Sequence, residues 1–147
     1  MKDFGYTMEQ IETMLNKKSG LLGMSGVSND LRDVEAAALA GNGDAENALE
    51  SYCYQIKKQI GAYAAAMGGV DAVAFAGGIG ENSALIREKT LEGLGFLGIL
   101  LDKAKNESAR PDCELTDEGG SARIFVVATN EEIVVARKAK EFLENRA

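Results

Sequence analysis

The stretch FAGGIGENS, residues 75–83, joins an apolar run to an amphipathic one. Before it, VDAVAFAGG (70–78) is built from Val, Ala and Phe between glycines, which predicts a short strand buried on both faces. After it, ENSALIREKTLEGLG (81–95) repeats apolar residues at steps of three and four, which predicts a helix. The glycines therefore lie at a strand-to-helix turn, where open α/β sheets bind ligands beyond the carboxyl ends of their strands.

Three glycines of this turn, Gly77, Gly78 and Gly80, have no Cβ atom, so a ligand can lie against their backbone. The start of the following helix offers unpaired N–H groups to an anion. Since the stretch has neither the P-loop ending GK[ST] nor the spacing G-x-G-x-x-G, we expect close backbone contact with a nucleoside or a terminal phosphate. Alternatively, the glycines only let the helix pack closely on the sheet, with Asn82 or Glu81 as its N-cap. The spacing alone leaves both interpretations open.

The stretch ATNEE, residues 128–132, is a second place where a predicted buried strand runs into a helix. Thr129 and Glu132 have capping-box spacing, which predicts that the Glu132 side chain accepts the backbone N–H of Thr129. Glu131 is then left free to hold Mg²⁺ beside nucleotide phosphates, directly or through water. The alternative is a solvated acid that favours the positive end of the helix.

A third candidate is SNDLRD, residues 28–33. Asp30 can accept hydrogen bonds from hydroxyls or an exocyclic amine, and Arg32 can stack on a base or bind a phosphate. Taken alone, the stretch is equally an ordinary capped helix start with an internal ion pair.

The rest of the chain alternates helical and strand patterns, which predicts an α/β fold. Residues 19–30 are interpreted as an ordered loop, and residues 103–121 as an exposed polar excursion. Further helices are predicted at residues 7–18, with Thr7 and Gln10 at capping-box spacing, and at 30–41, 44–67 and 131–145. Further strands are predicted at residues 96–102, 113–115 and 124–128.

Composition narrows the class of protein. The 147 residues suit one domain, and a net charge of -7 argues against nucleic-acid and anionic-membrane partners. The start of the chain has no apolar signal region and no run approaches the length that spans a bilayer, so we expect a cytoplasmic protein. Cys53 and Cys113 are expected to be reduced thiols. The sequence has no His, which removes the usual general base and transition-metal ligand.

Together, three blocks in this order resemble the C-terminal part of the acetate kinases, the acetokinase family of the actin/hexokinase/Hsp70-like superfamily. The blocks are LNKKSGLLGMSGVSNDLRD, IKKQIGAYAAAMGGVDAVAFAGGIGENSALIREKTLEGLGFLGILLD and ATNEEIVVAR. The resemblance weakens only from about Glu107 to Ser121. It implies an α/β fold, part of a C-terminal ribonuclease H-like (actin/hexokinase/Hsp70-type ATPase) domain with buried strands and long flanking helices. Residues 1–147 would form a single nucleotide-binding domain fragment.

The resemblance also implies an activity. The family transfers a phosphoryl group from ATP, with Mg²⁺ or Mn²⁺, to acetate or another short carboxylate, and the reverse reaction makes ATP. DLR resembles its adenosine-binding motif, although Leu31 stands where Phe is more usual, and GIGEN resembles its nucleotide loop. The implied nucleotide-binding residues are Asp30, Leu31, Arg32, Gly78, Ile79, Gly80, Glu81 and Asn82, and the implied metal ligand is Glu131.

The family's proteins are much longer, and their catalytic Asp, transition-state His and substrate-binding Arg residues lie upstream of these blocks. We therefore expect a C-terminal fragment with no catalytic residue, inactive alone. Since family members are homodimers joined largely through their C-terminal domains, the resemblance also implies a homodimer. Two alternatives remain open. One is a fragment of a propionate or butyrate kinase. The other is a non-catalytic module that binds nucleotide or associates through GAYAAAMGG (61–69), whose small residues permit close helix approach.

Overall fold

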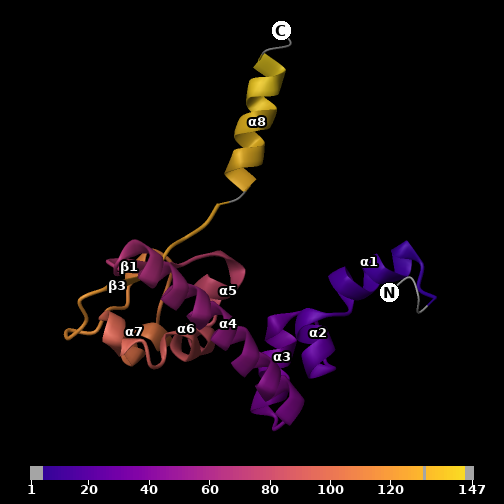
Figure 1. Ribbon diagram of the computed structural model, residues 1–147. Helices are drawn as coiled ribbons and strands as arrows, with labels where there is room; N and C mark the ends of the chain where they lie inside the picture. Colours follow the sequence, from indigo (N-terminus) through magenta and orange to yellow (C-terminus); the bar gives the residue numbers. More distant parts are fainter. Residues whose placement is uncertain (1–4, 131, 145–147) are drawn as a thin grey trace. The chain divides into compact units, whose positions relative to one another are not determined.

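The computed structural model describes residues 5–130 and 132–144, and Figure 1 shows the order of the helices and strands. The chain divides into two compact units. One comprises Met1–Gly69 with Glu88–Gly93, and the other comprises Val70–Arg87 with Leu94–Ala147. Helix α6 (Ala84–Leu91) contributes residues to both units.

The first unit begins with α1 (Met8–Lys17), and both halves of its predicted capping box are present. The Thr7 hydroxyl accepts the Gln10 N–H at 3.2 Å, and the Gln10 side chain accepts the Thr7 N–H at 2.9 Å. This confirms the first predicted helix and its start. None of the side chains of α1 is buried, so capping rather than packing defines where it begins.

Helix α2 (Gly20–Ser25) lies where the sequence predicted a loop, so that prediction was wrong. The helix runs from the N-cap Ser19 to Gly26, whose φ of 66° is the left-handed conformation typical of a helix end. Because α2 packs against α4 (Gly43–Met67), tertiary contact offsets the weak helix propensity of its glycines.

Helices α3 (Leu31–Leu39) and α4 form the core of the first unit, and both were predicted. The Asn42 side chain caps α4 by accepting the Ala45 N–H at 3.0 Å, and Gly68 ends it with φ 77°. Lys89 of α6 forms an ion pair with Glu50 of α4. The buried apolar side chains of this unit are Leu31, Val34, Ala45, Ala48, Leu49, Cys53, Ala64 and Leu91.

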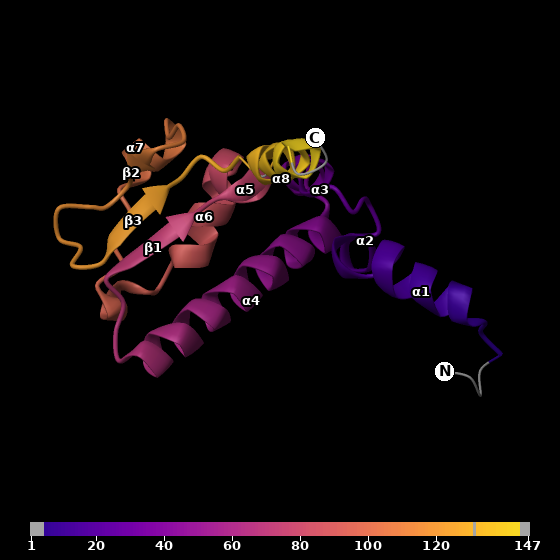
Figure 2. The ribbon, with the colours of Figure 1, turned by 90° about the horizontal axis from the view of Figure 1, so that it is seen from above.

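The second unit contains a three-stranded sheet in the order β1-β3-β2, with β1 (Ala72–Phe75) and β3 (Arg123–Val126) side by side in Figure 2. These two strands are parallel, with Phe75 opposite Val126, and β2 (Cys113–Glu114) is antiparallel to β3. Because β1 and β3 run in the same direction, the segments that follow them emerge at the same edge of the sheet.

Helix α5 (Gly77–Asn82) follows β1 at once and leads into α6, while the 3-10 helix η2 (Gly95–Leu97) and α7 (Lys103–Glu107) precede β2. The core of this unit comprises Phe75, Ile86, Leu94, Ile99, Leu115, Ala122, Ile124 and Val126.

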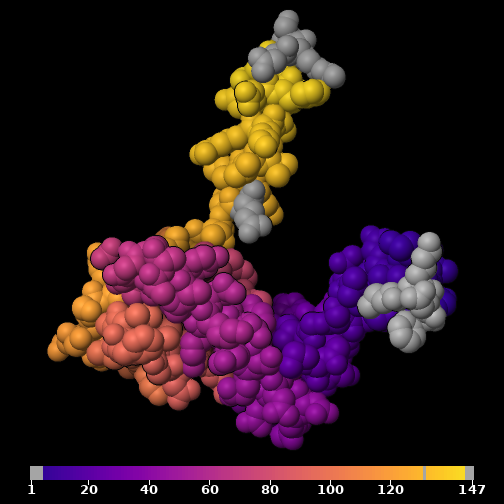
Figure 3. All heavy atoms as spheres, in the orientation of Figure 1, coloured from indigo at the N-terminus to yellow at the C-terminus, as the bar shows by residue number. Residues whose placement is uncertain are grey.

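The last helix, α8 (Glu132–Glu144), follows β3 and confirms the predicted closing helix. Its apolar side chains include Val135 and Leu143, which are exposed. Figure 3 draws the heavy atoms of α8 as spheres at the yellow end of the colour scale. No helix in the described part of the chain is long and apolar enough to cross a membrane.

Three strand and loop predictions need correction. Strand β1 is not buried on both faces: Ala72 and Ala74 are exposed, and β1 is paired only with β3 among the described residues. Residues 96–102 form no strand but η2 and two isolated bridges, at Ile99 and Leu101. Residues 103–121 include α7 and the buried Leu115, so they are not simply an exposed excursion, although the short strand predicted at residues 113–115 is present as β2.

Candidate functional site

The glycine stretch is itself helical. Residues Gly77 to Asn82 form α5, which starts from Ala76 immediately after β1. This is the strand-to-helix position that the sequence predicted, but the glycines lie inside the helix rather than in a turn before it.

The three glycines have different structural roles. Gly77 has φ 71°, which L residues with a side chain rarely adopt. A Cβ atom on Gly80 would lie 3.1 Å from the backbone carbon of Phe75, so Gly80 allows α5 to pack closely on the end of β1. Gly78 has a negative φ, and no atom of the described residues lies within 4 Å of its Cβ position. Packing therefore explains Gly80 and backbone conformation explains Gly77, while neither explains Gly78.

Glu81 joins α5 to the segment after β3. One oxygen, Oε1, accepts the backbone N–H of Gly77 at 3.0 Å, the backbone N–H of Thr129 at 3.0 Å and the Thr129 hydroxyl at 2.6 Å. These hydrogen bonds stabilise the ionised carboxylate, with those from Thr129 dominant, and they lower the pKa of Glu81 below its ordinary value of 4.5.

The other residues near the end of α5 bond locally. The Asn82 side chain donates to the Gly78 carbonyl at 2.7 Å, and the Ser83 hydroxyl accepts the Ile86 N–H at 3.1 Å, as an N-cap side chain does. The helix that follows the glycines is therefore capped at Ser83 and not at Asn82 or Glu81, as the packing alternative expected. The close packing that the same alternative expected is present at Gly80. Ile79 is partly exposed, at 36%.

A buried arginine supports α5 from within the second unit. Arg87 is 2% exposed, and its guanidinium donates to the carbonyls of Gly80 at 2.8 Å and Glu81 at 3.1 Å. It also donates to the side chain of Asn106 at 2.7 Å and to the Asn106 carbonyl at 3.0 Å. Asn106 is 1% exposed and donates in turn to the Ala84 carbonyl at 2.9 Å. Burial lowers the pKa of Arg87, whose hydrogen-bond acceptors are all neutral in the part of the chain that the structure describes.

The sequence did not single out Arg87 or Asn106. Arg87 stands beside Ile86 in an amphipathic pattern, and Asn106 stands in a polar stretch, so neither differs in local pattern from a surface residue. Their buried hydrogen bonds depend on α7 lying against the start of α6, which is a tertiary feature.

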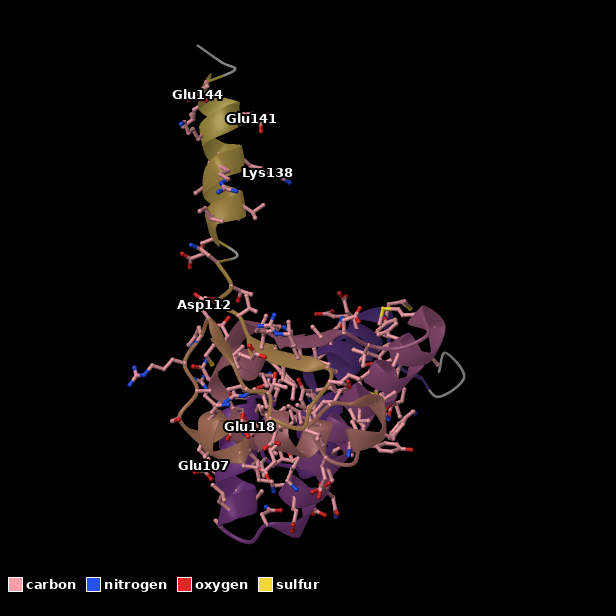
Figure 4. All side chains as sticks on the ribbon, turned by 90° about the vertical axis from the view of Figure 1, so that its left-hand side faces the viewer. Glu107, Asp112, Glu118, Lys138, Glu141 and Glu144 are labelled. Atoms are coloured by element: carbon pink, nitrogen blue, oxygen red, sulfur yellow. The ribbon has the colours of Figure 1, made fainter. Side chains whose placement is uncertain are left out.

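The segment after β3 has a different cap from the one predicted. The Thr129 N–H is bonded to Glu81, and the Asn130 side chain accepts the Ile133 N–H at 3.1 Å. The capping box of Thr129 and Glu132 was therefore wrong, because Glu81 from α5 takes the donor that Glu132 was expected to take. Asp112, labelled in Figure 4, accepts the Ala128 N–H of the same segment at 3.0 Å.

The expected metal ligand, Glu131, lies outside the described residues. Over residues 5–130 and 132–144, no group of three or more acidic or cysteine side chains is placed to hold a metal ion. The nearby carboxylate of Glu81 already accepts three hydrogen bonds. The described residues therefore do not by themselves form a metal site.

Residues Asp30 to Arg32 belong to the first unit. The Asp30 side chain caps α3 by accepting the Arg32 N–H at 3.0 Å, and it forms an ion pair with the Arg32 guanidinium at 2.5 Å. These contacts lower the pKa of Asp30 to about 2. The Arg32 side chain is 87% exposed, whereas Leu31 is 6% exposed and packs in the helical core. The stretch has the form of a capped helix start whose guanidinium faces solvent.

The profile of the acetokinase family matches residues 1–137. The acetate kinase of Methanosarcina thermophila is 48% identical over 144 residues, which cover 98% of this chain and 35% of that protein. The acetate kinase of Natranaerobius thermophilus is 47% identical over 139 residues, again 35% of its length. The chain therefore spans about a third of the length of the curated relatives it matches.

Solved structures of acetate and propionate kinases also resemble this chain. The crystal structure of Porphyromonas gingivalis acetate kinase superposes with a TM-score of 0.85 at 43% identity, over 97% of this chain and 36% of that one. A propionate kinase from Francisella tularensis superposes with a TM-score of 0.80 at 36% identity, over 92% and 34%. The fold class predicted from the sequence, part of a ribonuclease H-like α/β domain, is confirmed by these neighbours. The chain belongs to the acetokinase family.

Proposed function

We propose that these 147 residues carry the adenine-nucleotide side of an acetate kinase, the enzyme that transfers the γ-phosphoryl group of ATP to acetate and gives acetyl phosphate and ADP. The observation that carries the proposal is the 48% identity to a protein named acetate kinase over 98% of this chain. The open backbone at Gly78 supports it, because its conformation and its packing against the described residues leave that glycine unexplained.

In this proposal the nucleotide lies against α5, with Gly78 and Ile79 offering the accessible surface. The exposed guanidinium of Arg32 stacks on a base or binds a phosphate, and Asp30 holds it in place through their ion pair. The full proposed set is Asp30, Leu31, Arg32, Gly78, Ile79, Gly80, Glu81 and Asn82.

We assign the divalent cation, Mg²⁺ or Mn²⁺, to the complete enzyme, where it would neutralise charge on the transferring phosphoryl group. Within this chain Glu131 is the residue proposed to contribute to its binding. The described residues do not by themselves form the cation's site.

Calorimetric titration of the chain with ADP and Mg²⁺ tests the nucleotide assignment. The expected result is saturable binding at one site. Heats no larger than those of the buffer blank, at millimolar ADP, would overturn the assignment. The same titration separates this function from a purely structural or association module, which binds no ADP.

The acetate side is proposed to depend on residues outside this sequence. We therefore expect acetate-dependent hydroxamate formation by the 147-residue chain alone to stay at background. Turnover near that of an intact acetate kinase would contradict this expectation. A homodimer is proposed for the intact enzyme, and sedimentation of that enzyme tests it.

A propionate kinase is the second candidate, because the Francisella tularensis propionate kinase also superposes on this chain. Its TM-score and identity are lower than those of the Porphyromonas gingivalis acetate kinase, so acetate is preferred. Comparing acetate, propionate and butyrate as acceptors for the intact enzyme separates the two.

A further inference from the structure

We propose that Glu81 is a positioning residue, which ties α5 to the segment 128–130 and does not itself contact the nucleotide. This inference rests on the proposed nucleotide function and corrects one residue of the set that the family resemblance implies. These hydrogen bonds of Glu81, called the tie below, join the segment that carries Gly78 to the segment that leads to Glu131.

The two segments leave the sheet side by side, and beyond the last strand hydrogen bond another contact has to fix the distance between them. The parallel ladder between β1 and β3 ends with the Val127 N–H donating to the Phe75 carbonyl at 2.8 Å. Beyond that hydrogen bond the chain turns into α5 on one side and runs towards α8 on the other, so the strands no longer fix their separation.

Glu81 supplies this link with one oxygen atom. Its Oε1 accepts from the Gly77 N–H at the start of α5 and from both the N–H and the hydroxyl of Thr129, which lies 48 residues further along the chain. The Gly77 N–H also donates to the Thr129 hydroxyl oxygen at 3.2 Å. Since charge-assisted hydrogen bonds are stronger than neutral ones, a carboxylate suits this position better than an amide.

The same hydrogen bonds argue against Oε1 of Glu81 as a nucleotide contact. Its Oε1 already has three donors, so a ribose hydroxyl at that oxygen would compete with the bonds that join the segments. A carboxylate also repels phosphate oxygens. The described groups that face Glu81 are hydrogen-bond donors from Gly77 and Thr129, and none of them is a cation.

A double-mutant cycle in the full chain tests the role. Glu81→Gln removes the charge, Thr129→Val removes the hydroxyl at constant shape, and Thr129→Ser retains it. If Glu81 acts through Thr129, Glu81→Gln and Thr129→Val each weaken ADP binding by a similar factor of about tenfold. The double variant is then no weaker than either single one, and Thr129→Ser binds like the unaltered chain.

A matched control is Glu118→Gln, which removes the same charge from another residue of the second unit, labelled in Figure 4. It is expected to leave ADP affinity unchanged. The proposal is overturned if Glu81→Gln weakens binding while Thr129→Val does not, if the two losses multiply, or if Glu81→Gln binds as tightly as Glu118→Gln.

Amide hydrogen exchange without nucleotide distinguishes failure of this inference from failure of the proposed function. The Gly77 and Thr129 amides are expected to exchange about tenfold faster in Glu81→Gln than in the unaltered chain, while the Ile124 amide inside β3 keeps its rate. Unchanged exchange at both amides overturns the tie, whether or not ADP binds. Faster exchange in a chain that binds no ADP would retain the tie as a structural feature and overturn its role in nucleotide binding.

Discussion

Arg87 is a full charge at a position that is 2% exposed, and its acceptors are backbone carbonyls and one amide. Buried cations are costly unless their hydrogen bonds are satisfied. Here the guanidinium donates to the carbonyls of Gly80 and Glu81 at the end of α5, where the helix dipole favours a positive charge. Arg87 therefore supports the glycine helix from its buried side.

Replacing Arg87 is expected to destabilise the second unit. Arg87→Met leaves the Asn106 side chain and two α5 carbonyls without their donor, so the free energy of unfolding should fall by about 2–4 kcal/mol. The matched control is Arg123→Met, which removes an exposed ion pair to Glu114 and should cost about 1 kcal/mol or less. Urea titration of both variants measures the difference. Equal losses of unfolding free energy in the two variants would show that the buried hydrogen bonds of Arg87 add no stability.

The glycines of α5 give a second comparison between single residues. Gly80→Ala puts a Cβ atom 3.1 Å from the backbone of Phe75 and should lower the free energy of unfolding by about 1–3 kcal/mol. Gly78→Ala meets no atom within 4 Å and should stabilise the helix by about 0.5–1 kcal/mol. Thermal unfolding of the two variants checks the signs. Destabilisation by Gly78→Ala would contradict the finding that the space around the Cβ position of Gly78 is open.

The sequence predicted this stretch as a site, but it could not divide the glycines by role. Gly80 and Gly78 differ only in what lies beside them, and that depends on the angle at which α5 leaves β1. Arg87 was missed for the same reason, since its burial depends on α7, about twenty residues away in a polar stretch.

At the level of helices, capping patterns were good predictors where no distant group competed. Thr7 and Gln10 cap α1 as predicted, because α1 has no buried side chains and few tertiary contacts to override the local pattern. Thr129 and Glu132 have the same spacing but do not form a capping box, because Glu81 reaches Thr129 from another helix. Helix α2 was missed because its glycines resemble a loop until packing against α4 is known.

Two N-caps should respond differently to truncation. Asn42 caps α4, which buries five side chains, so Asn42→Ala should lower the global free energy of unfolding by about 1 kcal/mol. Thr7 caps α1, which buries none, so Thr7→Ala should fray α1 without shifting the global transition. Hydrogen exchange along both helices, combined with urea titration, measures the two effects. A global loss of equal size in Thr7→Ala would contradict the independence of α1.

For the molecule as a whole, acid should destabilise the fold. Hydrogen bonds and ion pairs lower the pKa of Glu114, through Arg123, and that of Asp30, through Arg32, to about 2, and they also lower the pKa of Glu81 and Asp102. A carboxyl with a depressed folded pKa stabilises the fold above its ordinary pKa, and this contribution is lost as pH falls through the folded pKa. Stability should therefore decline between about pH 4.5 and pH 2.

The urea midpoint measured from pH 7 to pH 2 tests this decline. Glu114→Gln should make the decline smaller, because the carboxyl paired with Arg123 is gone while the other three remain. Glu118→Gln, which removes a charge without breaking that ion pair, is the control and should retain the decline. A midpoint independent of pH below 4.5 would show that these carboxyls do not stabilise the fold.

The fold class and family could be predicted because they depend on the order of many blocks along the chain. Both are confirmed over nearly the whole chain. The site residues remain predictions, because Glu131 lies outside the described residues and Asp30 to Arg32 belong to a different compact unit from α5.

Titration of Gly78→Ala with ADP and Mg²⁺ tests the central claim most directly, namely that nucleotide lies against the backbone of α5. Gly61→Ala is the matched control, because Gly61 is a helical glycine of α4 that also has nothing within 4 Å of its Cβ position. We predict that Gly78→Ala weakens ADP binding by about tenfold or more without lowering stability, while Gly61→Ala binds ADP like the unaltered chain. Undiminished ADP affinity in Gly78→Ala would contradict the claim.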